Sequence, residues 1–335
     1  GAEAVENMMK YFINLHDEEL MKRGQIPSVR RFVYFDRAFH GRTVFALGVT
    51  QLEHDPVVTR DFRGFVPGNL QVPFPSTDSS QPAERNERRM ATSLSIVEDC
   101  LRSYRGEVVG MIVEPIQGAG GQRAADPAFF RGLSELAHRY DVFLGFDEVQ
   151  TAGGQTGTVF AIDQFDLPYP PQAVATAKKF ANGAVYMLYP MSDRGVLDST
   201  WGGNLADMVR FVQEMRVVEE EGLIEQVPAK AERLVTGLQD LADRFHDLIF
   251  NIRGMGLYQG FTLRVAEHKG RLRQIALEAE QLLLLGAGTQ TIRFRPVLDV
   301  TAEEIDRMLG QLGRCLERLE KETPAGAPAP PPSVD

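Results

Sequence analysis

Cysteine is scarce in this sequence. The 335 residues include only Cys100 and Cys315, which lie far apart along the chain. Two cysteines so placed form neither a disulfide framework nor a thiolate metal site, and disulfides persist mainly outside reducing compartments. We therefore expect a cytoplasmic protein without disulfides.

Long apolar runs and clustered positive charge are also missing. No stretch approaches the ~18 apolar residues that a membrane-spanning helix requires, and no basic segment followed by an apolar one opens the chain. Lys and Arg number 36 against 46 Asp and Glu, a formal net charge of −10, without a basic stripe interleaved with aromatics. We therefore expect small molecules as partners, with no nucleic acid and no membrane.

Signatures of metal and nucleotide sites are absent too. The six histidines are scattered without a pair at ligand spacing, so no metal is expected. No G-x-x-x-x-G-K-[ST] loop is present to cradle nucleotide phosphates. The run GMGLYQG at 254–260 has the wrong glycine spacing for a dinucleotide fingerprint and precedes a predicted strand, where that fingerprint requires a helix.

The first part of the chain alternates helices with apolar strands. Strands are predicted at 31–36, 108–113, 142–146 and 173–177, and helices at 5–20, 84–104 and 127–140. Residues 51–83, rich in Pro, Asp and Ser, are predicted to be a long surface excursion. Near-continuous apolar strands separated by helices are typical of a parallel sheet covered on both faces. We predict an α/β fold with a mostly parallel large domain at 1–205.

The second part of the chain predicts a smaller α+β unit. Helices are expected from 205, at 229–245, up to about 283 and at 302–320, with a strand at 257–265 and a hairpin-like pair ending in TIRFRPV. We assign 206–321 to a connecting helix and a small C-terminal domain. The Pro- and Ala-rich tail, 322–335, is predicted to be disordered.

Three functional side chains stand at the ends of predicted parallel strands. Glu114, Asp147 and Lys178 each follow an apolar run, and ligands of such sheets bind beyond the carboxyl ends of the strands. A pyridoxal phosphate ring requires a carboxylate against its pyridine nitrogen and a lysine that holds it as a Schiff base. Asp147 and Lys178 suit those roles, although an isolated lysine is more often a solvated surface residue. Magnesium binding by Asp147 and Glu148 would need the missing phosphate loop.

Phosphate groups have two candidate binding segments. The first helix opens with Gly1 and Ala2, whose backbone N–H groups suit a phosphate, although every helix has such an end. In STWGGN, residues 199–204, the hydroxyl of Thr200 either reaches a ligand or caps the helix that follows.

Substrate carboxylates and the cofactor ring also have candidates. In FHGRT, residues 39–43, Phe39 either covers a ring or packs in the core, and Arg42 binds either a substrate or a surface acid. Arg293 and Arg295 share one face of a predicted strand. Paired arginines suit a planar carboxylate, and equally a protein acid.

Taken together, these segments resemble the class III, ω-type aminotransferases of the pyridoxal phosphate fold type I superfamily. The matching pieces run in the family's order from residue 1 to about 298: GAEAVEN, FHGRT, VEPIQG, FDEVQTAGGQTG, STWGGN, RGMGLYQG and IRFRPVL. Within the family, AKKF, STWGGNLADMVR and IRFRP are similar to the lysine 6-aminotransferase subgroup.

The resemblance implies pyridoxal 5'-phosphate as cofactor and a homodimer with shared active sites. It implies these cofactor roles: Asp147 at the pyridine nitrogen, Gln150 at the ring hydroxyl, Lys178 as the Schiff-base lysine, Phe39 on the ring, Gly1 and Ala2 at the phosphate, and Thr200 at the phosphate of the neighbouring subunit. Lys179 is the alternative Schiff-base lysine. Glu114 and His40 would support the residues that touch the cofactor.

The resemblance also implies a reaction. Arg42 and Arg293 would bind substrate carboxylates, with Arg293 holding 2-oxoglutarate. The expected activity moves the terminal amino group of L-lysine to 2-oxoglutarate, giving 2-aminoadipate 6-semialdehyde and glutamate. Ornithine, 4-aminobutyrate or diaminobutyrate is the alternative donor. The alternative that is not an enzyme is an inactive truncated protein with this fold.

The sequence departs from the family's pattern at two places. The run EPIQGAGG has Ala119 where the family usually has a glutamate that gates the substrate arginine. Arg293 is therefore expected to stay unpaired. The family's N-terminal segment is also expected to be missing, because the chain begins at the phosphate-binding motif, and the segment between Lys178 and STWGGN is short.

Overall fold

The computed structural model describes residues 1–26, 29–55, 57, 62, 67–192 and 195–322. Six strands form the larger sheet, in the order β2-β1-β3-β6-β7-β8, with every neighbouring pair parallel except β7 and β8. These strands are β1 (Arg31–Phe35), β2 (Leu70–Val72), β3 (Val108–Val113), β6 (Phe143–Asp147), β7 (Ala173–Thr176) and β8 (Ala184–Met187). The predicted parallel sheet is thereby confirmed.

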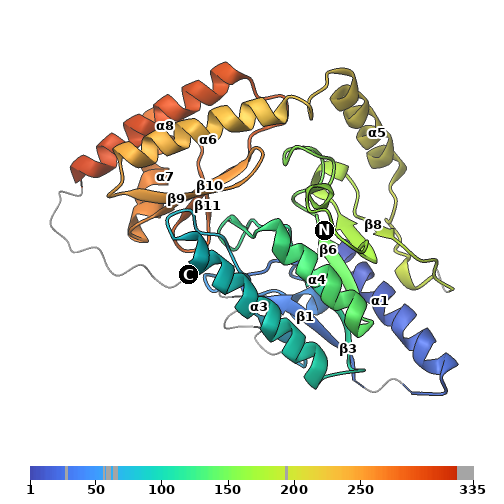
Figure 1. Ribbon diagram of the computed structural model, residues 1–335. Coiled ribbons are helices and arrows are strands. Elements are labelled where there is room, and N and C mark those ends of the chain that lie inside the picture. The colour runs from blue at the N-terminus through green and yellow to red at the C-terminus, as the bar shows by residue number, and fades with distance from the viewer. Residues whose placement is uncertain (27–28, 56, 58–61, 63–66, 193–194, 323–335) are drawn as a thin grey trace.

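Helices cover both faces of this sheet (Figure 1). On one face, α1 (Ala2–Lys22) buries its apolar stripe against β3, β6 and β7. On the other face, α3 (Ala83–Ser103) and α4 (Pro127–Tyr140) lie side by side and close a core rich in phenylalanine. A Cβ atom at Gly145 would lie 2.7 Å from the sulfur of Met8 and 2.8 Å from the ring of Phe12. A glycine in β6 thus lets α1 approach the sheet closely.

A second, antiparallel sheet carries the remaining core. Its strands, in the order β11-β12-β10-β9, are β9 (Ile249–Met255), β10 (Tyr258–Leu263), β11 (Leu285–Ala287) and β12 (Thr291–Phe294). The helices α6 (Val227–Arg244), α7 (Glu267–Glu280) and α8 (Ala302–Glu322) pack around it. Along the chain, α5 (Leu205–Glu220) connects the large sheet to α6; it lies at the edge of the molecule in Figure 1 and buries none of its residues.

Short elements complete the described chain. They are α2 (Val44–Leu47), β4 (Ile116–Gln117), β5 (Arg123–Ala124), and three 3-10 turns, η2 (Ala161–Gln164), η3 (Lys178–Phe180) and η4 (Gly195–Leu197). β4 and β5 pair as a small antiparallel hairpin. In the part of the chain that the structure describes, no helix combines the length and the hydropathy needed to cross a bilayer.

Most predicted elements are present, with five strands that the sequence did not indicate: the two-residue strands β4 and β5, and β2, β8 and β9. β2 lies within 51–83, the stretch predicted as a surface excursion, and its three residues are too few to produce a clear alternation. β8 is half exposed and follows β7 directly, while β9 mixes polar residues and glycine into its run. The division at residue 205 stays a prediction. Glu322 ends α8 and is no part of a tail, and 323–335 lie outside the described residues.

Candidate active site

Asp147 ends β6 and is buried at the edge where the parallel strands end, with 5% of its surface exposed. Its Oδ1 atom accepts a hydrogen bond of 3.0 Å from the backbone N–H of Val149. Its Oδ2 atom lies 2.8 Å from Nδ1 of His40. Both carboxylate oxygens are therefore held in place by the chain.

His40 reaches this carboxylate from the loop that follows β1. Its ring is buried, and its backbone N–H donates to the hydroxyl of Thr50 at 2.9 Å. Burial acts to lower the pKa of His40, but the hydrogen bond and the charge of Asp147 outweigh burial and raise this pKa above its usual value. The His40 ring therefore holds Oδ2 of Asp147 at the edge of the sheet, where a carboxylate could pair with a cationic ring nitrogen.

Lys178 lies just after β7, which is the neighbour of β6 in the sheet. Its backbone has a φ of 56°, in the left-handed region that residues with a side chain rarely adopt. Burial lowers the pKa of the Lys178 amine, against the charges of Asp147 and Glu114, and Arg295 and Arg293 lower it further. Lys178 is therefore within electrostatic range of the carboxylates of Asp147 and Glu114.

The Lys179 side chain has different partners from that of Lys178. Its Nζ atom donates to Oε1 of Gln155 at 2.6 Å and to the hydroxyl of Tyr258 at 2.8 Å. Burial lowers the pKa of Lys179 to about 7. Of the two adjacent lysines, Lys178 is the one that Asp147 influences, so the geometry favours Lys178 over Lys179 as the Schiff-base lysine.

The first helix begins close to Asp147 and Lys178. Gly1 is the N-cap of α1, and a Cβ atom on it would lie 2.8 Å from Val149 and 3.8 Å from Ala177. Backbone N–H groups in the first turn of a helix have no intrahelical acceptor and attract anions. The N-terminus of α1, with Gly1 and Ala2, is thus next to residues that follow Asp147 and precede Lys178. In Figure 1 the marked N-terminus lies beside β6.

Gln150 lies against the backbone of the β4–β5 hairpin. A Cβ atom on Gly118 would lie only 1.7 Å from Oε1 of Gln150. The absence of a side chain at Gly118 therefore determines where the Gln150 amide can lie.

A hydrogen bond joins Phe39 to Glu114. The backbone N–H of Phe39 donates to Oε2 of Glu114 at 3.0 Å. Burial raises the pKa of Glu114 to about 8, with the charge of Asp147 adding to burial and that of His40 opposing it. Glu114 is thus the acid near this site that gains or loses its proton near physiological pH.

Arg42 and Arg293 differ in how they are paired. Arg42 forms an ion pair with Asp55, and its guanidinium lies 5.3 Å from the ring centre of Phe39. Arg293 projects from β12 of the small sheet, and its buried Nε and Nη1 atoms have no hydrogen-bond partner in the described structure. Burial, followed by the charge of Arg295, lowers the pKa of Arg293 to about 10. Arg42 is therefore already paired with a protein acid, whereas two nitrogens of Arg293 lack an acceptor among the described residues.

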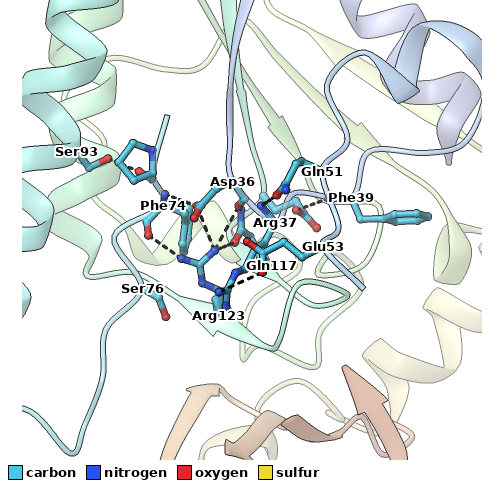
Figure 2. Close-up of polar contacts among 12 residues, drawn as sticks. Asp36, Arg37, Phe39, Gln51, Glu53, Phe74, Ser76, Ser93, Gln117 and Arg123 are labelled. Atoms are coloured by element: carbon cyan, nitrogen blue, oxygen red, sulfur yellow. Dashed lines mark hydrogen bonds and ion pairs between the residues drawn. The ribbon is translucent and has the colours of Figure 1, made fainter. Parts of the chain in front are cut away.

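A buried arginine holds the β4–β5 hairpin against the end of β1 (Figure 2). Nη1 of Arg123 donates to Oε1 of Gln117 at 2.8 Å and to Oδ1 of Asp36 at 3.2 Å, and Nη2 donates to the carbonyl of Phe74 at 2.9 Å. The hairpin carries Gly118, and the chain after β1 carries Phe39 and His40. This network thus fixes two site segments relative to each other.

Thr200 is separate from the other candidates. It is exposed, it makes no hydrogen bond or ion pair with them among the described residues, and the neighbouring Trp201 is 82% exposed. Glu148, next to Asp147, is fully buried and has a structural role. It accepts hydrogen bonds from the hydroxyl of Thr151 and from the backbone N–H groups of Ala161 and Ile162, which start a 3-10 turn.

Sequence reasoning missed Tyr258 and Arg123. Tyr258 lies within the recognised segment GMGLYQG, whereas Arg123 lies two residues after the EPIQGAGG run. Their partners lie up to 108 residues away in sequence, and no spacing in the sequence indicates such contacts. Within the described residues, no group of three or more His, Cys, Asp or Glu side chains is arranged to hold a metal.

Comparisons with known proteins show which family the chain belongs to. The family model described as aminotransferase class-III matches residues 1–316. The chain is 31% identical to an L-lysine-epsilon aminotransferase of Amycolatopsis lactamdurans, over 94% of this chain and 71% of that protein. It is 33% identical to an acetylornithine aminotransferase of Agrobacterium fabrum, over 91% of this chain and 70% of that protein.

Among solved structures, the lysine aminotransferase from M. tuberculosis in the internal aldimine form is similar to this chain with a TM-score of 0.89 and 31% identity. The match covers 95% of this chain and 74% of that one. The predicted fold type I architecture and the predicted cofactor are thereby confirmed. The chain belongs to the class III aminotransferases and is a pyridoxal phosphate-dependent enzyme.

Proposed function

We propose that this aminotransferase moves the terminal amino group of L-lysine to 2-oxoglutarate, giving 2-aminoadipate 6-semialdehyde and glutamate. The similarity to proteins named L-lysine-epsilon aminotransferase carries the proposal, because it extends over 93–94% of the chain at 30–33% identity. Acetylornithine aminotransferases match at 31–33% identity. N-Acetylornithine is therefore the second candidate donor, beside ornithine, 4-aminobutyrate and diaminobutyrate.

The side chains and backbone groups of the site fit pyridoxal phosphate. A buried carboxylate, Asp147, supports a protonated ring nitrogen, and the start of α1 offers free N–H groups to a phosphate. Lys178 is the lysine that would hold the cofactor, Gln150 would bind its ring hydroxyl, and Phe39 would cover the ring. When bound, pyridoxal phosphate supplies a ring that accepts the electron pair released at the substrate carbon.

The protein's own groups would bind the substrates and move the proton. Nζ of Lys178, with its pKa lowered by burial, would take a proton from the substrate carbon that bears the amino group. The unpartnered guanidinium of Arg293 would bind a carboxylate of 2-oxoglutarate. Arg42, which lies over Phe39, would bind a carboxylate of the amino donor. Glu114 and His40 would hold Phe39 and Asp147 in position.

The same proposal includes a homodimer with shared active sites. Large apolar side chains are exposed in and after β8 and along α5: Tyr186, Met187, Leu188, Tyr189, Trp201, Leu205, Met208, Val209 and Val212. An exposed apolar patch of this kind is typical of a protein–protein interface. Thr200 lies within this surface, from which it would reach the cofactor phosphate of the neighbouring subunit. The cytoplasmic location stays a prediction.

Spectroscopy and a donor panel test the proposal. Adding pyridoxal phosphate should produce an absorbance band near ~420 nm that Lys178→Ala loses, and borohydride reduction should attach the cofactor to the peptide that contains Lys178. L-Lysine should then exceed N-acetylornithine and ornithine in turnover with 2-oxoglutarate. Turnover with N-acetylornithine but not with lysine would refute the donor, and the absence of the band in the unsubstituted chain would refute cofactor binding.

A further inference from the structure

Lys179 is a buried amine that the proposed reaction leaves without a role. Its two hydrogen-bond acceptors, Oε1 of Gln155 and the hydroxyl of Tyr258, are uncharged, and no salt bridge is found for it among the described residues. Its Nζ atom also lies 4.9 Å from the ring centre of Tyr258. Burial of an amine without an ionic partner is costly, so the position calls for a functional explanation.

The hydrogen bonds of Lys179 form a directed chain. The amine donates to the hydroxyl of Tyr258 at 2.8 Å, and this hydroxyl donates to the backbone carbonyl of Gln150, also at 2.8 Å. Lys179 adjoins Lys178, Gln150 follows Asp147, and Tyr258 opens β10 of the small sheet. One tyrosine hydroxyl thus connects both cofactor-binding segments of the large sheet to the small one.

The glycine-rich loop at 150–157 is packed tightly between these partners. A Cβ atom at Gly153, whose φ is 105°, would lie 3.2 Å from Cβ and Cε of Lys179. On the other side, the backbone N–H of Leu257 donates to the carbonyl of Gln155 at 2.7 Å. The loop that bears Gln150 therefore has the Lys179 side chain on one side and the β9–β10 turn on the other.

The link also extends to the substrate arginines. β10 pairs with β12 in a register that sets Gly260 opposite Arg293 and Gln259 opposite Phe294. A restraint on Tyr258 therefore restrains the strand that carries Arg293. The charged groups that influence Lys179 are Glu148, after β6, Arg295, after β12, and the adjacent Lys178.

We propose that Lys179 is a positioning residue of the transamination site. Through Tyr258 it holds the Gln150 loop and the Lys178 turn against the small sheet, and so fixes the cofactor-binding groups relative to Arg293. This inference rests on the proposed function only where Lys178 and Gln150 are taken to bind the cofactor.

The test uses the full chain, first without cofactor. Hydrogen exchange of peptides covering 150–157 should accelerate about 10-fold in Lys179→Met and in Tyr258→Phe, while peptides from α8 exchange as before. The dissociation constant for pyridoxal phosphate should rise about 10-fold in each variant. The double variant should lose little more than either single one, because both changes break the same chain.

Controls separate positioning from general damage. Lys22→Met removes an exposed lysine at the end of α1 and should change neither readout. Tyr258→Phe keeps the ring and removes only the hydroxyl, so it decides the question even if Lys179→Met fails to fold.

The proposal is overturned if loop exchange and cofactor affinity are unchanged in Tyr258→Phe, or if borohydride reduction attaches the cofactor to Lys179. If L-lysine alone fails as an amino donor, loop exchange and cofactor affinity can still be measured. That result would count only against the proposed substrate.

Discussion

His40 Nδ1 and Asp147 Oδ2 lie 2.8 Å apart in a buried pair that joins the loop after β1 to the end of β6. The relationship is electrostatic as well as positional, because the charge of Asp147 raises the pKa of His40 against the effect of burial. The hydrogen bond also fixes the orientation of the Asp147 carboxylate. The strength of Asp147 as a partner for a cationic ring therefore depends on a residue that need not touch the ring.

Replacing His40 by leucine should weaken cofactor binding. A hydrogen bond to a charged group contributes about 1.5–3 kcal/mol, so the dissociation constant for pyridoxal phosphate should rise about 10- to 100-fold. Fluorescence titration of the cofactor-free protein measures this change. His138→Leu, which alters an exposed histidine of α4 that stacks on Tyr169, is the matched control. Equal affinities in the two variants would contradict the role given to His40.

A methyl group at Gly118 should disturb the cofactor site while the fold remains intact. The added Cβ atom would lie 1.7 Å from Oε1 of Gln150, the far end of a flexible side chain, so the amide is expected to move aside. Gly118→Ala should therefore weaken pyridoxal phosphate binding with little change in Tm. Gly270→Ala is the control, because a Cβ atom there meets nothing within 4 Å.

Calorimetry gives the Tm of both glycine variants, and titration gives their cofactor affinity. Gln150→Ala should weaken pyridoxal phosphate binding to a similar degree. In the double variant, the loss of cofactor affinity should not exceed the sum of the two single losses. A large fall in the Tm of Gly118→Ala would show instead that the backbone, and not Gln150, had to yield.

Much of the fold could be predicted because parallel strands buried on both faces leave apolar runs such as VVGMIV at 108–113. Asp147 and Lys178 were recognisable because each follows such a run, and strand ends of one parallel sheet meet at one edge. The contact between Lys179 and Tyr258 could not be predicted, since the two residues are 79 apart in sequence, with Lys179 in the turn after β7 of the large sheet and Tyr258 in β10 of the small sheet. Such contacts depend on how the two sheets pack, which no local pattern records.

Glu114 should make the cofactor-free protein less stable as pH rises. Burial raises its pKa from 4.5 to about 8, so between these values the folded protein binds a proton that the unfolded chain releases. The stability from this proton is complete below the unfolded pKa and is lost as pH rises through about 8.

Glu114→Gln keeps an oxygen acceptor for the Phe39 N–H and removes the titration. The fall in Tm between about pH 6 and about pH 9 should therefore be smaller in this variant than in the parent. Glu87→Gln, on the exposed side of α3, should leave the parent's fall unchanged. An identical slope in parent and Glu114→Gln would contradict a raised pKa at Glu114.

Arg293 should lower the stability of the free protein and favour substrate binding. Its Nε and Nη1 atoms are buried without a partner, and an unpaired buried cation destabilises the free protein. Arg293→Met should therefore raise the Tm of the cofactor-free protein, by roughly 2–4 °C for each kcal/mol relieved. The same change should lower kcat/KM for 2-oxoglutarate about 100-fold, because a charge-assisted hydrogen bond to a carboxylate is lost. Arg88→Met, an exposed substitution on α3, should change neither quantity. A lower Tm with unchanged kcat/KM would mean that Arg293 serves the fold and not the substrate.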